Sequence, residues 1–152
     1  EVNDPDDPGG HTKYGISARA YPDVDIAELT REDAGEIYRK DYWDACHCNE
    51  LAHGIDITVF DAAVNTGTKQ ATKFLQRALG VTADGIIGPL TLSAAELSVL
   101  QPLHVIADIQ TERAEFLCDI VDNRAQSMKY LTGWLRRTTW LTIEATNLAT
   151  AH

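Results

Sequence analysis

Apolar residues recur every three or four positions along most of the chain beyond residue 30, which is the spacing that places them on one face of a helix. The longest apolar stripe follows Pro102, and a last helix is predicted from Tyr130 to beyond Leu141. The stripe after Pro102 consists of Val105, Ile106, Ile109, Phe116, Leu117, Ile120 and Val121. No two segments form a convincing pair of strands. The pattern therefore predicts an all-α chain.

Helix ends are marked by residues that commonly cap helices. Thr30 is a candidate N-cap with Asp33 three positions later, an acidic variant of the capping box, for a helix that reaches Trp43. A stripe from Ile57 to Val64 is expected to end at Gly67. Thr68 is then expected to cap the next helix, whose inward residues are Phe74, Leu75, Ala78 and Leu79 and which stops at Gly80.

A turn is predicted where Asp84-Gly85 and Gly88-Pro89 follow each other, with a short helix starting at Thr91-Leu92. The chain has 152 residues, of which 44% are hydrophobic, enough to bury one core. We therefore expect a single compact domain with two closely packed lobes.

The first sixteen residues differ from the rest, because aspartates, prolines and glycines crowd them. The run Val2-Asn3-Asp4-Pro5-Asp6-Asp7-Pro8-Gly9-Gly10 precedes His11-Thr12-Lys13-Tyr14-Gly15-Ile16. Proline restricts the backbone and glycine frees it, so the segment is a shaped loop. Asp, Asn, Pro and Gly are also the usual residues of a solvated turn. From composition alone, a candidate site and a plain turn both remain open.

The run from Val2 to Ile16 resembles the signature of the family-108 glycoside hydrolases, which are bacterial and phage N-acetylmuramidases. The resemblance continues through Tyr21-Pro22, Tyr38 to Trp43, Phe60-Asp61, Val64-Asn65-x-Gly67 and Phe74 to Val81. From Asp84 to Leu92, the chain is similar to the peptidoglycan-binding half that accompanies this family, and the similarity ends near Gly133-Trp134-Leu135. The resemblance implies a lysozyme-like helical bundle, with a muramidase region at 1–80 and a helical peptidoglycan-binding region at 81–152.

The main departure from the family is at the first residue. The family's catalytic glutamate opens a Glu-Gly-Gly-Tyr motif, but here Glu1 stands directly before Val2. Either Glu1 is the catalytic glutamate, or it occupies the tyrosine position and the catalytic glutamate lies three positions upstream. In the second case eight residues separate that glutamate from Asp7, as in phage lysozymes of the Glu-x8-Asp-x5-Thr type. We expect the chain to be truncated at its N-terminus.

Glycosidic cleavage needs an acid for the leaving oxygen and a carboxylate that stabilises or traps the oxocarbenium-like transition state or activates water. The resemblance gives the first role to Glu1 or its upstream counterpart. Asp7 suits the second, because a polar glycine-rich loop keeps it ionised. Thr12 is expected to orient water or to hold Asp7, or else is a turn residue. Tyr14 is expected to form a wall of the sugar cleft.

Further substrate-binding candidates lie on the predicted helices. Asp61 shares a helix face with apolar residues, where an unpaired charge is costly, and Asn65 one turn later is its expected partner. The two either line the saccharide groove or brace two helices. Tyr42 and Trp43 either stack on sugar rings or belong to the core. Another candidate patch holds Trp134, Arg136 and Arg137, whose arginines either meet wall carboxylates or cap a helix end.

Charge and composition narrow the classes of partner. The formal net charge of -10, from 23 acidic and 13 basic residues, argues against nucleic acid, which requires clusters of Lys and Arg. No apolar run approaches the roughly 20 residues that span a bilayer, so we expect no stable membrane insertion within this chain. We expect no cofactor, a monomer and peptidoglycan as the partner, with action in the periplasm or cell wall; the export route stays open.

The chain has three cysteines, Cys46, Cys48 and Cys118. Because an odd number cannot all pair within one chain, they predict no disulfide framework. Cys46-His47-Cys48 lacks the usual spacing and second pair of a zinc site. Asp4, Asp6 and Asp7 lack the order of the common calcium loop. We therefore expect no metal.

The sequence thus predicts a muramidase, either a phage endolysin or a bacterial wall-remodelling enzyme. Two alternatives remain: a non-catalytic peptidoglycan-binding module, and a lytic transglycosylase, which needs the acid but not a carboxylate that directs water.

Overall fold

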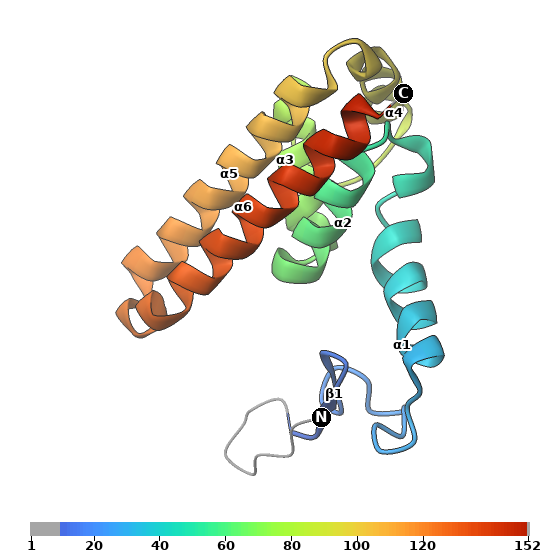
Figure 1. The fold of residues 1–152 in the computed structure, drawn as a ribbon, viewed down its shortest axis with the longest axis vertical. Coiled ribbons are helices and arrows are strands. Elements are labelled where there is room, and N and C mark those ends of the chain that lie inside the picture. Colours follow the sequence, from blue (N-terminus) through green and yellow to red (C-terminus); the bar gives the residue numbers. More distant parts are fainter. Residues whose placement is uncertain (1–9, 152) are drawn as a thin grey trace. The chain divides into compact units, whose positions relative to one another are not determined.

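The computed structural model describes residues 10–151, so Glu1 and Asp7 lie outside the described residues. These residues are mostly helical (Figure 1), which confirms the all-α prediction. The elements are β1 (Thr12–Lys13), β2 (Ile16–Ser17), α1 (Arg31–Tyr38), the π-helix η1 (Arg39–Asp44), the 3-10 helix η2 (Cys48–Glu50), α2 (Ile55–Thr66), α3 (Thr68–Ala78), α4 (Pro89–Leu97), the 3-10 helix η3 (Ser98–Leu100), α5 (Pro102–Asn123), the 3-10 helix η4 (Ala125–Ser127) and α6 (Met128–Thr150). The chain divides into two compact units after Asp41.

The N-terminal unit contains a short antiparallel hairpin that the sequence did not predict. Thr12 pairs with Ser17 and Lys13 with Ile16, so the expectation of no strand pair is wrong. Strands of two residues are too short to show an alternating pattern. The connecting residues Tyr14 and Gly15 both have positive φ, 53° and 80°, as a two-residue hairpin turn of type I′ requires.

Helix α1 begins as its sequence predicts. The Thr30 hydroxyl accepts a hydrogen bond from the Asp33 backbone N–H at 3.1 Å, and the Asp33 carboxylate accepts one from the Thr30 N–H at 3.1 Å. This reciprocal capping box satisfies two N–H groups that the first turn leaves open. The helical path continues past Tyr38 as η1 and so includes Trp43, but with the wider winding of a π-helix. The buried core of this unit consists of Ile16, Ile26, Leu29 and Ala34.

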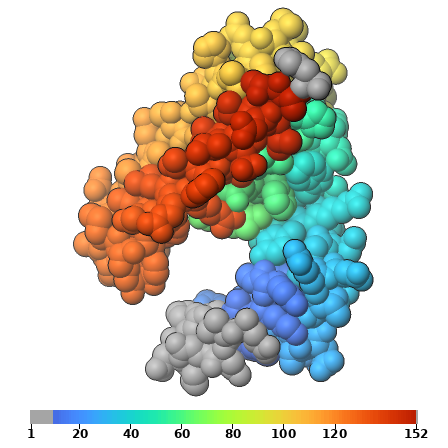
Figure 2. Space-filling model, in the orientation of Figure 1, coloured from blue at the N-terminus to red at the C-terminus, as the bar shows by residue number. Residues whose placement is uncertain are grey.

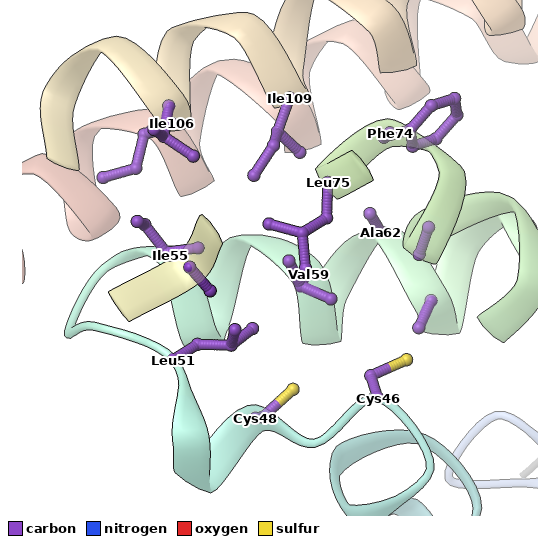
Figure 3. Packing of buried hydrophobic residues seen from close by; sticks show 14 of the residues in the cluster. Cys46, Cys48, Leu51, Ile55, Val59, Ala62, Phe74, Leu75, Ile106 and Ile109 are labelled. Atoms are coloured by element: carbon purple, nitrogen blue, oxygen red, sulfur yellow. The ribbon is translucent and has the colours of Figure 1, made fainter. Parts of the chain in front are cut away.

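The C-terminal unit is a helical bundle with a larger core. Helices α5 and α6 lie side by side and are joined by η4, and α2 and α3 pack against them (Figure 1). The core is built from the facing sides of these helices and the loop before α2, as Figure 3 shows. Its labelled residues are Cys46, Cys48, Leu51, Ile55, Val59, Ala62, Phe74, Leu75, Ile106 and Ile109. In α5, the predicted positions Val105, Ile106, Ile109, Leu117 and Val121 are buried.

The junction between α2 and α3 differs in one detail from the prediction. Gly67 ends α2 as expected, but it is also the N-cap of α3, and Thr68 is the first helical residue. One residue therefore serves both helices, with φ of 92° and ψ of 152°. That conformation is accessible to glycine and strained for other residues, so glycine replaces the side-chain cap that Thr68 was expected to provide.

The outer sides of α5 and α6 form much of one face of the C-terminal unit (Figure 2). Several large apolar side chains are exposed where α4 leads into α5, namely Leu90, Leu97, Val99, Leu100 and Leu103. Among residues 10–151, no helix combines the length and apolar character that a membrane span needs.

Candidate functional site

The hairpin of the N-terminal unit carries two predicted site residues, Thr12 and Tyr14. Thr12 lies in β1 and is half-buried. Its hydroxyl donates to the Gly10 carbonyl at 3.2 Å, a local bond that fits the turn-residue alternative. The same hydroxyl oxygen has lone pairs to accept a further bond. Thr12 is therefore held in the first strand of the hairpin.

Tyr14 is held in an uncommon backbone conformation at the tip of the hairpin. Its φ of 53° lies in the left-handed region, which non-glycine residues rarely adopt and which concentrates at functional sites. Its side chain is 48% exposed, so the ring is available for stacking. Lys13 Nζ lies 5.8 Å from the ring centroid and donates to the Ala27 carbonyl at 2.7 Å.

Tyr38, the last residue of α1, holds this turn through a hydrogen bond. Its hydroxyl donates to the Tyr14 carbonyl at 2.9 Å. A Cβ added at Gly15 would stand 2.5 Å from the Tyr38 hydroxyl oxygen, so only glycine permits this close approach. The hairpin turn is thus clamped by Tyr38 and anchored by buried Ile16. The sequence did not predict this role of Tyr38, because the apolar pattern of α1 gives no sign of a contact with a turn 24 residues earlier.

A second side-chain contact in this unit joins Tyr21 to Asp41, both of which are half-buried. The Tyr21 hydroxyl donates to Asp41 Oδ2 at 2.8 Å. Asp41 lies in η1, and π-helical turns occur frequently at functional sites. Tyr21 and Tyr38 both pack against the small core of this unit, and the Tyr38 hydroxyl bonds to the carbonyl of the hairpin turn.

Asp61 lies in the C-terminal unit and has two arginine partners. Arg113 Nη2 of α5 lies 2.8 Å from Asp61 Oδ2. Arg137 of α6 approaches with Nη2 2.6 Å and Nε 2.9 Å from Oδ1. Asn65, the expected partner of Asp61, instead accepts hydrogen bonds from Arg113. Its Oδ1 lies 3.2 Å from Nε and 2.9 Å from Nη2 of that arginine. The four side chains brace α2, α5 and α6, which is the structural alternative that the sequence left open.

Arg113 is the least exposed member of this cluster, with a side-chain exposure of 0%. Burial lowers the pKa of its guanidinium, and the neighbouring Asp61 carboxylate opposes that shift. Its Nη1 has no hydrogen-bond partner among the described residues. Arg137 is 46% exposed while it binds Asp61, so this arginine keeps a donor face toward solvent. Arg137 belonged to a candidate binding patch predicted from the sequence. Arg113 did not, because it lies within the apolar stripe of α5.

Tyr42 and Trp43 are half-buried and pack against the core of the C-terminal unit. Trp43 Nε1 donates to Asn49 Oδ1 at 2.9 Å, and its ring meets Phe60 edge-on at 5.6 Å between centroids. These contacts fit the core alternative for both aromatics. The predicted residues therefore fall into two groups: Thr12 and Tyr14 in one unit, and Tyr42, Trp43, Asp61 and Asn65 in the other.

The cysteines do not form a metal site within the described part of the chain. Cys46 and Cys48 are buried and Cys118 is exposed, all as free thiols. Burial raises the pKa of the Cys46 thiol, opposed by a hydrogen bond with Thr72, and burial also raises the pKa of Cys48. Residues 10–151 contain no group of three or more His, Cys, Asp or Glu side chains that could hold a metal ion.

Comparison with known proteins yields two family matches and a related structure. Residues 1–67 match the family model described as glycosyl hydrolase 108, and residues 70–139 match the one described as predicted peptidoglycan domain. The solved structure titled "Structure of Brucella abortus SagA" superposes with a TM-score of 0.84 at 28% sequence identity, covering 99% of this chain and 87% of that chain. No curated protein matches this chain.

Proposed function

We propose that the chain is an N-acetylmuramidase of the glycosyl hydrolase 108 family, whose model matches residues 1–67, with a predicted peptidoglycan domain at residues 70–139. The two matches support a glycoside hydrolase that acts on peptidoglycan. The finer proposal is hydrolysis of the β-1,4 bond between N-acetylmuramic acid and N-acetylglucosamine. The observation that supports it is the clamped hairpin, whose Thr12 follows the aspartate-rich segment of the sequence within the region that matches glycosyl hydrolase 108.

In the proposed mechanism, Glu1 or a glutamate upstream of it protonates the leaving oxygen. Asp7 stabilises or traps the oxocarbenium-like transition state, or activates the attacking water. Thr12 orients that water or holds Asp7 by a hydrogen bond, using the lone pairs that its bond to Gly10 leaves open. Tyr14 supplies a flat exposed face for a sugar ring.

The candidate binding residues of the C-terminal unit are proposed to act in two ways. Tyr42 and Trp43, both half-buried, are proposed to stack on sugar rings. Asp61 is committed to Arg113 and Arg137, so we propose that Asp61 and Asn65 position a binding surface. Within that surface, exposed Arg137 meets carboxylates of the wall. The proposed places of action are the periplasm or the cell wall, as a monomeric endolysin or wall-remodelling enzyme.

Mass spectrometry of the soluble fragments released from purified peptidoglycan tests this proposal. The chain as given is compared with the same chain preceded by Glu-Gly-Gly. Reducing-end muramic acid released by both forms assigns the acid to Glu1 or another residue of the chain. Release only by the extended form assigns the acid to the upstream glutamate. Release by neither contradicts the muramidase proposal and favours a non-catalytic binding module.

Asp7→Asn separates hydrolysis from lytic transglycosylation. A hydrolase that uses this carboxylate loses about 10²-fold or more in rate, whereas a transglycosylase keeps its rate and forms anhydromuramic ends. The measurement uses the form of the chain that releases fragments. Retained activity with anhydro products would replace the muramidase proposal by the transglycosylase alternative.

A further inference from the structure

A cavity of about 490 Å³ lies beside the turn that joins α3 to α4. None of the predicted site residues lines it. Its lining comes from Gln76 and from residues between Gly80 and Thr91. The side chains that matter for its chemistry are Val81, Thr82, Asp84, Ile86, Pro89 and Leu90.

The cavity is shaped before any ligand arrives, because Gln76 fixes the turn. Gln76 is buried, and its Nε2 donates to Asp84 Oδ1 at 2.8 Å and to the Ile86 carbonyl at 2.9 Å. Its Oε1 accepts from the Gly85 N–H at 2.8 Å. The Thr91 hydroxyl, 3.2 Å from Nε2, ties the start of α4 to the same amide. A preorganised site pays little ordering cost on binding.

Asp84 gives this cavity its charge, because it is the one ionisable side chain in the lining. Oδ1 accepts from Gln76 and from the Ile86 N–H at 2.9 Å. These bonds lower the pKa of the carboxyl, with the Ile86 N–H contributing most, so Asp84 is ionised at neutral pH. Oδ2 accepts neither bond and Asp84 is exposed, which leaves a carboxylate oxygen for a cationic donor.

The rest of the cavity is suited to small apolar groups. Ile86 is 69% exposed and Leu90 82% exposed, and Val81 and Pro89 complete the apolar lining. Covering such exposed aliphatic side chains with an apolar ligand group is favourable, because it removes apolar surface from water. A ligand that fits therefore carries an ammonium group together with short apolar side chains.

We propose that this cavity binds the peptide stem of peptidoglycan, with the free ammonium of its diamino acid at Asp84 and neighbouring alanine methyl groups against Ile86 and Leu90. The assignment rests on peptidoglycan being the substrate, as proposed above. It adds that the C-terminal unit recognises the peptide rather than the glycan. Binding through the peptide would hold the enzyme on the wall between cleavage events.

A second cavity beside the same turn supplies an internal contrast. It has a volume of about 290 Å³, and its lining includes Lys69 and His47 as well as Gly85 and Ile86 of the turn. His47 is paired with Glu50, Nδ1 to Oε1 at 2.8 Å. Lys69 packs its stem against Gly85, where an added Cβ would stand 2.7 Å from Lys69 Cγ. If the wall bound through a carboxylate, Lys69 would be required and Asp84 would not.

Co-sedimentation of the full chain with insoluble purified peptidoglycan tests the assignment. Asp84→Asn keeps the Oδ1 acceptor that holds the turn and removes the charge, so we expect binding about tenfold weaker. Lys69→Met keeps the stem against Gly85, and we expect its affinity within about twofold of wild type. Peptidoglycan whose free amines have been acetylated should bind the wild type about tenfold more weakly, and should show no further loss with Asp84→Asn.

Leu90→Ser provides a second variant, because this exposed side chain takes no part in holding the turn; we expect weaker binding from it as well. Unchanged affinity for acetylated peptidoglycan would overturn the proposal, and so would a loss confined to Lys69→Met. Fragment release by the wild type is measured separately by mass spectrometry. Binding that depends on Asp84 without any fragment release would contradict the muramidase proposal alone, and fragment release with Asp84-independent binding would contradict this inference alone.

Discussion

The two units of this protein hold their polar side chains in different ways. The described part of the N-terminal unit has a small core of Ile16, Ile26, Leu29 and Ala34. Its hairpin is fixed by backbone geometry, with left-handed residues at the turn and a hydroxyl bond from Tyr38. The C-terminal unit has a larger core and encloses a charged side chain, Arg113, within it. In the first unit, shape depends on a few local contacts. In the second, a polar cluster is part of the packing itself, so its loss should affect the whole bundle.

The largest effect is therefore expected from Arg113→Met in the C-terminal unit. The substitution leaves Asp61 with one arginine and Asn65 without its donor, so we expect the free energy of unfolding to fall by about 3 kcal/mol. Denaturant unfolding followed by circular dichroism measures it. Arg77→Met is the matched control, since Arg77 and Glu112 form a more exposed pair at 3.0 Å, worth below about 1 kcal/mol. Equal losses for the two variants would contradict a special role for the buried cluster.

The Asp61 cluster also shows where sequence reasoning reached its limit. The face of α2 predicted that Asp61 needs a partner, because helical spacing is a local property. The identity of the partner depends on how α5 and α6 pack on α2, and Arg113 was hidden within an apolar stripe. Asn65 was the nearest polar neighbour in sequence, but it reaches the cluster through Arg113.

The hairpin illustrates the same limit in the N-terminal unit. The capping box of Thr30 and Asp33 could be predicted, since its chemistry is complete within four residues. The turn of Tyr14 and Gly15 could not, because the usual signal for such a turn is Asn-Gly or Asp-Gly. Tyrosine adopts the left-handed conformation here with Tyr38 bonded to its carbonyl, a contact that the local sequence does not encode.

Gly15→Ala should have the next largest effect, confined to the N-terminal unit. The new Cβ meets the Tyr38 hydroxyl at 2.5 Å, at a residue with φ of 80°, so we expect a loss of about 2 kcal/mol from torsional strain and displacement of Tyr38. Gly10→Ala is the control, since Gly10 has φ of 68° and no atom of residues 10–151 lies within 4 Å of its added Cβ. It should show the torsional cost alone, about 1 kcal/mol. Thermal unfolding of both variants measures the difference, and equal losses would argue against a clamp at Gly15.

Tyr38→Phe should have a smaller effect on stability, about 1 kcal/mol, but a selective effect on catalysis. It removes the bond to the Tyr14 carbonyl and so loosens the strand that carries Thr12. We expect a lower kcat for fragment release with little change in KM, measured on the form of the chain that is active. Tyr21→Phe removes a hydroxyl bond to Asp41 in the same unit and leaves the bond from Tyr38 to the turn in place. A fall in kcat of the same size in both variants would reduce Tyr38 to a purely structural role.

The smallest expected effect is on the rate of thiol labelling, which reports whether the two units unfold independently. Thiolate rather than thiol reacts with iodoacetamide, and burial raises the pKa of Cys46 and Cys48, so near pH 8 we expect exposed Cys118 alone to label in the folded chain. Above about pH 9, unfolding ionises the two buried thiols, so stability falls as pH rises. Mass spectrometry of labelled chains then separates the variants. Arg113→Met should speed labelling of Cys46 and Cys48, because it destabilises the bundle that covers them. Tyr38→Phe should leave their labelling unchanged, and faster labelling in that variant would show that the hairpin and the bundle unfold as one cooperative unit.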